Sequence, residues 1–281
     1  MPPPVAIIMR SKNEMPHLRA ALEMLRLQTF RDFELFAVDS GSADGSVNLL
    51  RKYCRIGHLT QIAPAHYAPG RVLNSAIART GNPIIVLLNA DAVPLSKTWL
   101  ETLLAPILGN QADATFSRQI PRPDARFVVA YDYQRAYDPE KIKEPFFSAV
   151  ACAFKRELWE RHKFRRNLYA EDLIWATACR TFGATIQLVP ESEVEHSHNY
   201  SLKALFRKKY RHGRSFAKIH GKTSSLWQRL YLCGRELARD FLHACRSRKL
   251  RTIPYNIAYR IAIHAGLHKG LWDGRQREKR F

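Results

Sequence analysis

Three kinds of pattern are scarce in this sequence, and each scarcity excludes a class of protein. The five cysteines (Cys54, Cys152, Cys179, Cys233 and Cys245) are scattered, without the close pairs of a zinc or redox motif. An odd, unpatterned set favours reduced thiols in a cytosolic compartment over a disulfide scaffold. No window reaches the roughly 18 to 20 uncharged apolar residues that a spanning helix needs. The amino terminus also lacks the basic and apolar segments of a signal peptide. We therefore expect neither a spanning helix nor a secretory leader.

Glycine motifs that bind phosphate are missing as well. Neither GxGxxG nor GxxxxGK followed by Ser or Thr occurs in the chain, which argues against a dinucleotide-binding domain and a P-loop. No Ser or Cys stands in the strand–turn–helix context of a nucleophile elbow, which argues against hydrolases of that type.

Acidic residues are rare in only one part of the chain. Residues 1–199 carry 24 Lys or Arg and 21 Asp or Glu, a net charge of +3, whereas residues 200–281 carry 21 and 4, a net charge of +17. This asymmetry favours a polyanionic partner, either anionic lipid or nucleic acid. The length and an apolar content of 46% predict one large α/β domain at 1–200 and a basic amphipathic helical extension at 201–281.

The stretch from Ile84 to Pro94 organises the rest of the predicted domain. Five apolar residues, three of them β-branched, have the length and composition of a strand buried on both faces. The run ends at Asn89-Ala90-Asp91, and Pro94 then limits further ladder hydrogen bonding. A carboxylate at the end of such a strand points into the crevice where open α/β folds bind ligands. The simpler interpretation is that Asp91 only begins a turn.

Strands and helices alternate on both sides of this stretch. Apolar runs predict strands at 5–9 and 33–38, helices follow each of them, and Ser42 is a plausible N-cap for the second helix. This alternation predicts a mostly parallel sheet with right-handed crossovers. Residues 120–144 carry three prolines and many charges and are expected to form an irregular loop. Beyond residue 200 the spacing is helical, and Leu226, Leu230, Leu237 and Phe241 continue the apolar spacing.

Acids and amides follow the predicted strands at their carboxyl ends. Asn13 and Glu14 follow the first strand, Asp39 closes the second, and Asp91 closes the central one. Each of these residues, taken singly, reads as the beginning of a turn. Together they indicate one ligand-binding crevice, because parallel strand ends open on the same edge of a sheet.

Four motifs, in this order, carry a resemblance to a known family. They are Arg10-Ser-Lys-Asn-Glu14, Asp39-Ser-Gly-Ser-Ala-Asp-Gly45, Asn89-Ala-Asp-Ala-Val-Pro94 and Glu171-Asp172. They resemble the motifs of inverting, nucleotide-sugar-dependent glycosyltransferases of family 2, which have the GT-A fold. Arg71-x-x-Asn74 and His196-Ser-His-Asn-Tyr-Ser201 are similar to the rhamnosyltransferase-like branch. The resemblance covers residue 5 to about residue 215.

The resemblance implies a nucleotide-binding set and a metal-binding set. The nucleotide set comprises Ser11, Asn13, Glu14, Asp39, Arg71, Asn74 and Asn89. The family's metal motif has two aspartates where this chain has Asn89-Ala90-Asp91, so Asp91 stands alone and His196 or His198 would complete the shell. A nucleoside diphosphate is bridged by Mg²⁺ or Mn²⁺, and imidazole ligands suit Mn²⁺ better. The HxH pattern also fits an ordinary surface strand.

Asp172 is the expected general base of an inverting transfer, and Glu171 is expected on the acceptor side. Inversion needs one carboxylate to take the proton from the attacking hydroxyl. The alternative is that both acids only interact with the dipole at a helix N-terminus.

The resemblance predicts a sugar transferase that uses a UDP-, dTDP- or GDP-linked donor, with rhamnose as the candidate sugar. The acceptor would be a glycan or a lipid-linked glycan. The alternatives are a nucleotidyltransferase or a non-catalytic nucleotide-sugar-binding relative.

The basic extension fits three partners: an anionic membrane surface, the catalytic domain itself, or nucleic acid. No nucleic-acid-binding module is visible. We therefore expect a cytoplasmic protein, peripheral on the cytoplasmic face of the inner membrane.

Overall fold

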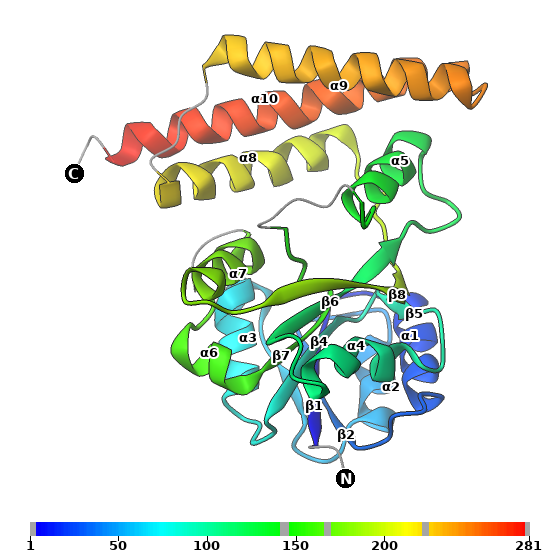
Figure 1. Cartoon of the computed structure of the whole chain (residues 1–281), viewed down its shortest axis with the longest axis vertical. Coiled ribbons are helices and arrows are strands. Elements are labelled where there is room, and N and C mark those ends of the chain that lie inside the picture. The colour runs from blue at the N-terminus through cyan, green and yellow to red at the C-terminus, as the bar shows by residue number, and fades with distance from the viewer. Residues whose placement is uncertain (1–3, 141–145, 166–169, 221–224, 279–281) are drawn as a thin grey trace. The chain divides into compact units, whose positions relative to one another are not determined.

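The computed structural model describes residues 4–140, 146–165, 170–220 and 225–278 (Figure 1). The chain forms two compact units. The first comprises residues 1–123 and 133–197, and the second comprises residues 124–132 and 198–281. The first is called the sheet unit here and the second the helical unit.

The sheet unit is built on one mixed sheet of eight strands in the order β3-β2-β1-β4-β7-β6-β8-β5. The strands are β1 (Val5–Ser11), β2 (Phe33–Asp39), β3 (Leu59–Gln61), β4 (Ile84–Asn89), β5 (Val93–Pro94), β6 (Ala114–Ile120), β7 (Ala151–Lys155) and β8 (Ile186–Glu195). β1, β2, β3 and β4 run parallel to one another, as predicted. β7 runs antiparallel to both β4 and β6, so the second half of the sheet departs from the parallel pattern.

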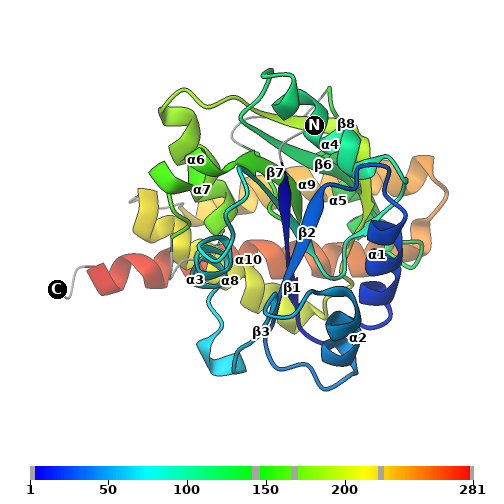
Figure 2. The same ribbon diagram turned by 90° about the horizontal axis from the view of Figure 1, so that it is seen from below.

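Helices cover both faces of this sheet. Leucines of α1 (His17–Arg26), α2 (Ser46–Tyr53) and α4 (Trp99–Leu108) pack in one core, and α3 (Pro69–Ile77), α6 (Arg156–Arg161) and α7 (Glu171–Thr181) pack in the other. A short 3-10 turn, Pro64–His66, precedes α3. Figure 2 shows α1 and α2 on one side of the strands and α3 on the opposite side. The predicted α/β class is confirmed, and β4 is buried as its apolar run requires.

Two local predictions were wrong. The region predicted to be an irregular loop contains α5 (Phe127–Ala136), whose helical order the surrounding prolines and charges concealed. Ser42 is not a helix N-cap: Gly45 occupies that position, and the Ser42 hydroxyl lies 2.5 Å from Asp39 Oδ2. The Ser42 hydroxyl donates to Asp39 and accepts from the Asn13 amide at 2.8 Å, so it holds the loop after β1 instead of capping the helix.

The helical unit contains α8 (Leu202–His220), α9 (Leu226–Arg246), a 3-10 turn (Leu250–Thr252) and α10 (Ile253–Glu278). α8 and α10 approach each other through Gly213, Gly266, Gly270 and Gly274. A Cβ on Gly270 would lie 2.2 Å from the carbonyl oxygen of Tyr210, so glycine is required for this contact. None of the helices, over the residues described above, combines the length and apolarity needed to cross a bilayer.

Candidate active site

The candidate site lies at the carboxyl ends of β1, β2 and β4. β1 lies between β2 and β4 in register, so Ser11 pairs with Asp39, and Arg10 pairs with Asn89. Asp91 lies two residues beyond the end of β4, and it is buried, with only 4% of its surface exposed to solvent. The fold therefore gathers the strand-end acids and amides on one edge of the sheet, as the sequence pattern predicted.

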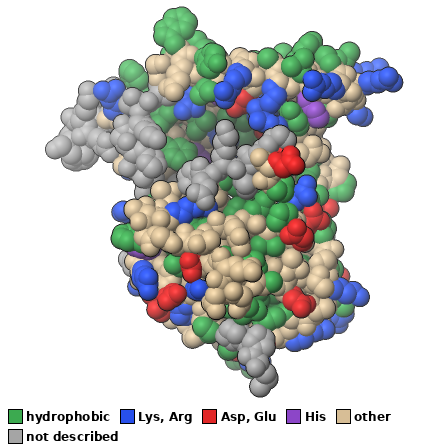
Figure 3. All heavy atoms as spheres, viewed as in Figure 1, with side chains coloured by type: hydrophobic (Ala, Val, Ile, Leu, Met, Phe, Trp, Pro, Cys, Tyr) green, Lys and Arg blue, Asp and Glu red, His purple; other side chains and the backbone are tan. Residues whose placement is uncertain are grey.

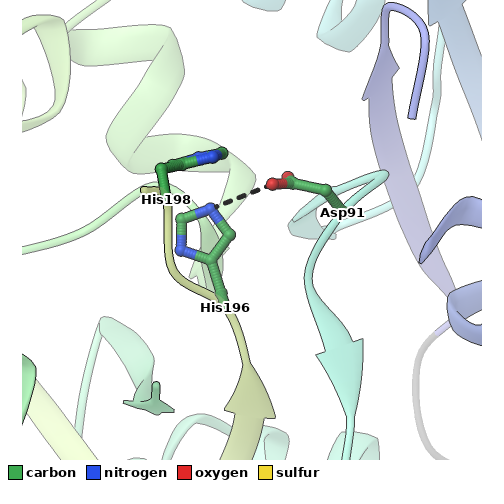
Figure 4. Close-up of side chains that lie close together, drawn as sticks. All are labelled: Asp91, His196 and His198. Carbon is green, nitrogen blue, oxygen red and sulfur yellow. Dashed lines mark ion pairs between the residues drawn. The ribbon is translucent and has the colours of Figure 1, made fainter. Parts of the chain in front are cut away.

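Asp91 and His196 form a close pair at this edge (Figure 4). His196 Nε2 lies 3.3 Å from Asp91 Oδ2. His196 directly follows β8, and β8 pairs with β5 just beyond Asp91, which explains how residues so distant in sequence meet. His198, two positions further on, also offers a ring nitrogen, and one ligand atom from each of the three residues lies within 4.8 Å of the others.

Gln119 fixes the orientation of the His196 ring. Its side-chain oxygen lies 2.8 Å from His196 Nδ1, and its amide nitrogen donates to Ser148 Oγ at 2.8 Å. An amide oxygen only accepts, so Nδ1 donates to Gln119 and Nε2 is the ring nitrogen that faces Asp91. The site thus offers a carboxylate oxygen and ring nitrogens close together. The donor set therefore fits a divalent cation with mixed nitrogen and oxygen ligands.

Arg122 places a positive charge beside the same carboxylate. Its Nη2 donates to the backbone oxygen of Asp91 at 2.5 Å and lies 3.4 Å from Asp91 Oδ2. Its Nη1 donates to the Ser197 carbonyl at 2.7 Å. Arg122 thus joins the segment after β6 to the two segments that carry Asp91 and His196, and it partly neutralises the carboxylate.

A second acidic group lies at the start of α7 and is joined to the strand ends by Arg10. Arg10 Nη2 donates to Asn89 Oδ1 at 2.9 Å, and Nη1 lies 3.5 Å from Glu171 Oε1. Asp172 Oδ1 accepts from the Leu173 amide at 2.8 Å, and Oδ2 lies 3.5 Å from the Ala149 amide. Arg10 therefore connects the end of β4 with Glu171, and its charge also acts on the neighbouring Asp172.

Burial raises the pKa of both acids. For Glu171, the charge of Asp172 adds to the effect of burial, and the charge of Arg10 opposes it. For Asp172, burial raises the pKa, whereas hydrogen bonds from Leu173 and Ala149 and the charge of Arg10 lower it. A carboxyl group with a raised pKa is a better proton acceptor than an exposed aspartate, which suits a general base.

The loop after β1 and the turn after β2 support each other. Asp39 is fully buried, and its Oδ1 accepts from the amides of Gly41 and Ser42 at 3.0 and 2.9 Å. Asn13 Oδ1 accepts from the Ala43 amide at 2.8 Å. Burial and the nearby charge of Asp91 raise the pKa of Glu14 to about 7. The Asp39 carboxylate thus builds the turn, and the predicted contact with nucleotide remains a prediction.

The other members of the predicted nucleotide set are placed differently. A cavity of about 280 Å³ is lined by Arg71 together with Val38 and Thr60 of β2 and β3. Arg71 Nη2 donates to the carbonyl oxygen of His66. Ser11 is buried at the end of β1. Asn89 is held by Arg10, as described above.

Asn74 has a packing role. Its side-chain oxygen accepts from Trp159 Nε1 at 2.9 Å and from the Phe164 amide at 3.1 Å, and its amide donates to the Phe164 carbonyl at 2.8 Å. These bonds hold the segment after α6 against α3, where Gly70 also permits close contact with Arg165.

Arg10, Gln119 and Arg122 are site residues that the sequence reasoning missed. Arg10 carried a signal, because it is a polar residue at the end of a buried strand. Gln119 and Arg122 carried none, since their partners His196 and Ser197 lie 77 and 75 residues away in sequence.

Comparison with known families and proteins agrees with this geometry. The model of the family described as glycosyl transferase family 2 matches residues 6–168, more than half of the chain. Asp172 and the His196 pair lie beyond the matched segment.

Two curated relatives are O-antigen chain rhamnosyltransferases of Salmonella. WbaN of Salmonella anatum is 26% identical over 196 residues, which cover 64% of this chain and 62% of that protein. RfbN of Salmonella typhimurium is 26% identical over 202 residues, which cover 66% of this chain and 64% of that protein. The chain thus spans a little under two thirds of the length of these relatives.

A similar solved structure is the mannosyltransferase PcManGT from Pyrobaculum calidifontis, in complex with GDP-Man and Mn²⁺. The TM-score is 0.66 at 21% sequence identity, with 97% of this chain and 88% of that chain covered. This likeness confirms the predicted GT-A fold.

Proposed function

We propose that this chain, which belongs to glycosyl transferase family 2, transfers a sugar from a nucleoside diphosphate to a hydroxyl group with inversion. The observation that carries the proposal is the pairing of Asp91 with His196 at a strand edge that Arg10 links to Glu171, the residue beside Asp172. The Asp91–His196 pair suits a cation that binds diphosphate, and Asp172 suits removal of the proton from the acceptor hydroxyl. An inverting transfer needs both in one site.

Asp91, His196 and His198 are the residues that would hold the cation. Two imidazoles and one carboxylate favour Mn²⁺ over Mg²⁺, because Mg²⁺ prefers oxygen ligands. The cation would supply charge to stabilise the departing diphosphate. Gln119 keeps the His196 tautomer that ligation requires, and Arg122 adds a fixed positive charge beside the same group.

Asp172 acts as the general base. The acceptor oxygen attacks the anomeric carbon and loses its proton to Asp172, while the bond from that carbon to the diphosphate breaks and the nucleoside diphosphate leaves. Arg10 holds Glu171 and Asn89, so Glu171 is the less available base. We assign Glu171 to the acceptor side. The raised pKa of Asp172 strengthens it as a proton acceptor.

The donor nucleoside would lie along Ser11, Asn13, Glu14 and Asp39, with Arg71 toward the phosphates. Support comes from the shared strand edge and from the cavity that Arg71 lines beside β2 and β3. UDP, dTDP and GDP are the candidate nucleotides.

Rhamnose is the candidate sugar and a lipid-linked glycan the candidate acceptor, because both curated relatives are named as O-antigen chain rhamnosyltransferases. An acceptor anchored in lipid places the reaction at a membrane. The basic helical unit, which carries most of the net charge of +20, suits the cytoplasmic face of the inner membrane.

The test is donor turnover with a panel of UDP-, dTDP- and GDP-sugars in the presence of Mn²⁺. We expect one donor to release nucleoside diphosphate. Asp91→Asn should lower this rate at least 100-fold, and Asp172→Asn should abolish transfer while retaining donor binding.

Asp32→Asn, an exposed residue before β2, is the matched control and should behave as the wild type. Release of pyrophosphate would instead indicate a nucleotidyltransferase. Binding of a donor without any release would indicate a non-catalytic relative.

A further inference from the structure

The solvent-facing side of α9 is apolar. Trp227, Tyr231, Phe241 and Leu242 are 79%, 69%, 51% and 54% exposed. With Gly234, Ala238 and Cys245, which are also exposed, they follow the three- and four-residue spacing of a single helix face. These seven residues are called the α9 stripe.

The opposite side of α9 carries the charges. Asp240 is 1% exposed, and its Oδ2 accepts from Arg260 Nε of α10 at 2.6 Å. Glu236 lies 3.3 Å from both Arg260 Nη1 and His264 Nε2. Arg260 also bonds Asp132 of α5 at 2.5 and 2.8 Å. A helix of a water-soluble bundle has the reverse arrangement, with its apolar face inward. The α9 stripe is therefore a surface that awaits an apolar partner.

Basic side chains surround the stripe. Arg235 and Arg246 flank it along α9, and Arg248, Lys249 and Arg251 follow in the connection to α10; all five are exposed. Glu236, Asp240 and Asp273, the acids of residues 200–275, are each engaged with a basic side chain. Figure 3 shows hydrophobic side chains along the outer edge of α9, with Lys and Arg close by.

We propose that the α9 stripe binds the surface of a bilayer that contains anionic lipid, with α9 lying parallel to the membrane. The apolar side chains enter the headgroup region, and the flanking arginines contact lipid phosphates. Tryptophan and tyrosine are the residues enriched at this depth of a membrane. The proposal rests on the proposed function for its membrane-bound acceptor, and it assigns the surface that makes the contact.

Charge argues against a second copy of this chain as the occupant. A twofold contact through the stripe would bring two sets of exposed arginines together, in a unit whose residues 200–281 carry a net charge of +17. Like charges facing each other across an interface disfavour association. An anionic bilayer offers the complementary charge and an apolar layer in the same surface.

Co-sedimentation of the full chain with phosphatidylglycerol-containing vesicles tests the proposal. We expect binding to such vesicles and at least tenfold weaker binding to pure phosphatidylcholine. The double substitution Trp227→Ser and Phe241→Ser should weaken binding at least tenfold. Both side chains are more than half exposed, so the fold is kept. The matched control is Ile56→Ser with Phe182→Ser, two exposed apolar residues of the sheet unit, and it should bind as the wild type.

A polarity-sensitive fluorophore on the exposed Cys245 gives a second readout. Cys54 and Cys233 are replaced by serine so that the label reacts at one site, since Cys152 and Cys179 are buried. Its emission should shift to the blue on addition of anionic vesicles. Equal sedimentation of the wild type and the stripe variant would overturn the proposal. A wild-type dimer that the stripe substitutions convert to a monomer would also overturn it, in favour of self-association. Donor turnover in vesicle-free solution should be unchanged in the stripe variant, so the two proposals fail separately.

Discussion

At the residue scale, the His196 ring is controlled by a neighbour that need not touch any ligand. Gln119 lies 2.8 Å from Nδ1 and is itself held by Ser148, so the ring is held in one orientation. Residues that hydrogen-bond a metal-ligating histidine commonly raise metal affinity roughly 10- to 100-fold, because they fix the orientation of the ligand before the metal binds.

We therefore expect Gln119→Leu to lower Mn²⁺ affinity about 10- to 100-fold with the fold intact. Titration calorimetry with Mn²⁺ alone measures this. Gln111→Leu, at an exposed position before β6, is the control. Wild-type affinity in Gln119→Leu would show that the ring is held by other contacts.

Arg10 sets the protonation of the acids at the start of α7. Its charge lowers the pKa of both Glu171 and Asp172 against the effect of burial. Replacing Arg10 by methionine should raise both pKa values, so the base is protonated up to a higher pH. The acid limb of the kcat/KM profile should then move upward by about one pH unit.

The measurement is the pH profile of donor turnover. Arg10→Lys keeps the charge, so the acid limb of its kcat/KM profile should lie close to that of the wild type. A uniform loss of rate with an unmoved limb would assign Arg10 a purely structural role.

At the scale of elements, α8 and α10 are held together by backbone-to-backbone contact. Gly270 of α10 lies against the carbonyl of Tyr210, and Gly213 of α8 lies against that of Leu267. A side chain at either position forces the helices apart. Overpacking of this kind costs about 1 to 3 kcal/mol.

Gly270→Ala should therefore lower the free energy of unfolding by at least that amount, measured by urea denaturation followed by circular dichroism. Gly234 of α9 is the matched control, because nothing lies within 4 Å of the position its Cβ would take. Gly234→Ala should raise stability by roughly 0.5 to 1 kcal/mol through helix propensity. Equal effects of the two substitutions would contradict the packing argument.

The buried Arg260 cluster makes the helical unit sensitive to acid. Burial opposes ionisation of Glu236, but the hydrogen bond to His264 and the charge of Arg260 outweigh it and lower its pKa from 4.5 to about 2. A depressed carboxyl pKa contributes stability that is fully present above pH 4.5 and is lost as the pH falls toward 2.

We expect the melting temperature to fall across that window and Glu236→Gln to flatten the fall. The difference in unfolding free energy should be on the order of 3 kcal/mol. Thermal melts from pH 2 to pH 6 measure it, with Glu160→Gln of the exposed surface as the control. An identical pH dependence in Glu236→Gln and wild type would remove Glu236 as the cause.

At the scale of the whole molecule, the basic charge is concentrated in residues 200–281, where the net charge is +17. Such a surface binds any polyanion at low salt. Contacts that consist only of phosphate and cation weaken steeply with salt, by about 10³ to 10⁵ between 50 and 200 mM for six to ten contacts.

Binding of the chain to duplex DNA should therefore vanish across this range of salt, independent of sequence. Binding to anionic vesicles should fall less steeply, because apolar insertion is not screened. Parallel salt series with both ligands measure the difference. A steeper loss for vesicles than for DNA would favour the nucleic-acid interpretation of the basic extension.

Sequence alone determined the features that depend on neighbouring residues. The apolar run of β4, the acid at its end and the charge asymmetry are local properties, and they indicated Asp91 and the basic extension, whereas Asp172 was indicated by the motif resemblance. The order of the motifs predicted the family and the GT-A fold, and both are confirmed.

Tertiary structure decided which side of each element faces a partner. Gln119 and Arg122 belong to the site only because β6 runs beside β8. Of the predicted apolar residues of α9, Leu226, Leu230 and Phe241 are exposed and Leu237 is half-buried, since ion pairs of Asp240 and Glu236 with Arg260 occupy the inner side of α9. Periodicity identifies a helix face but carries no information on what lies opposite, because that depends on contacts between residues far apart in sequence.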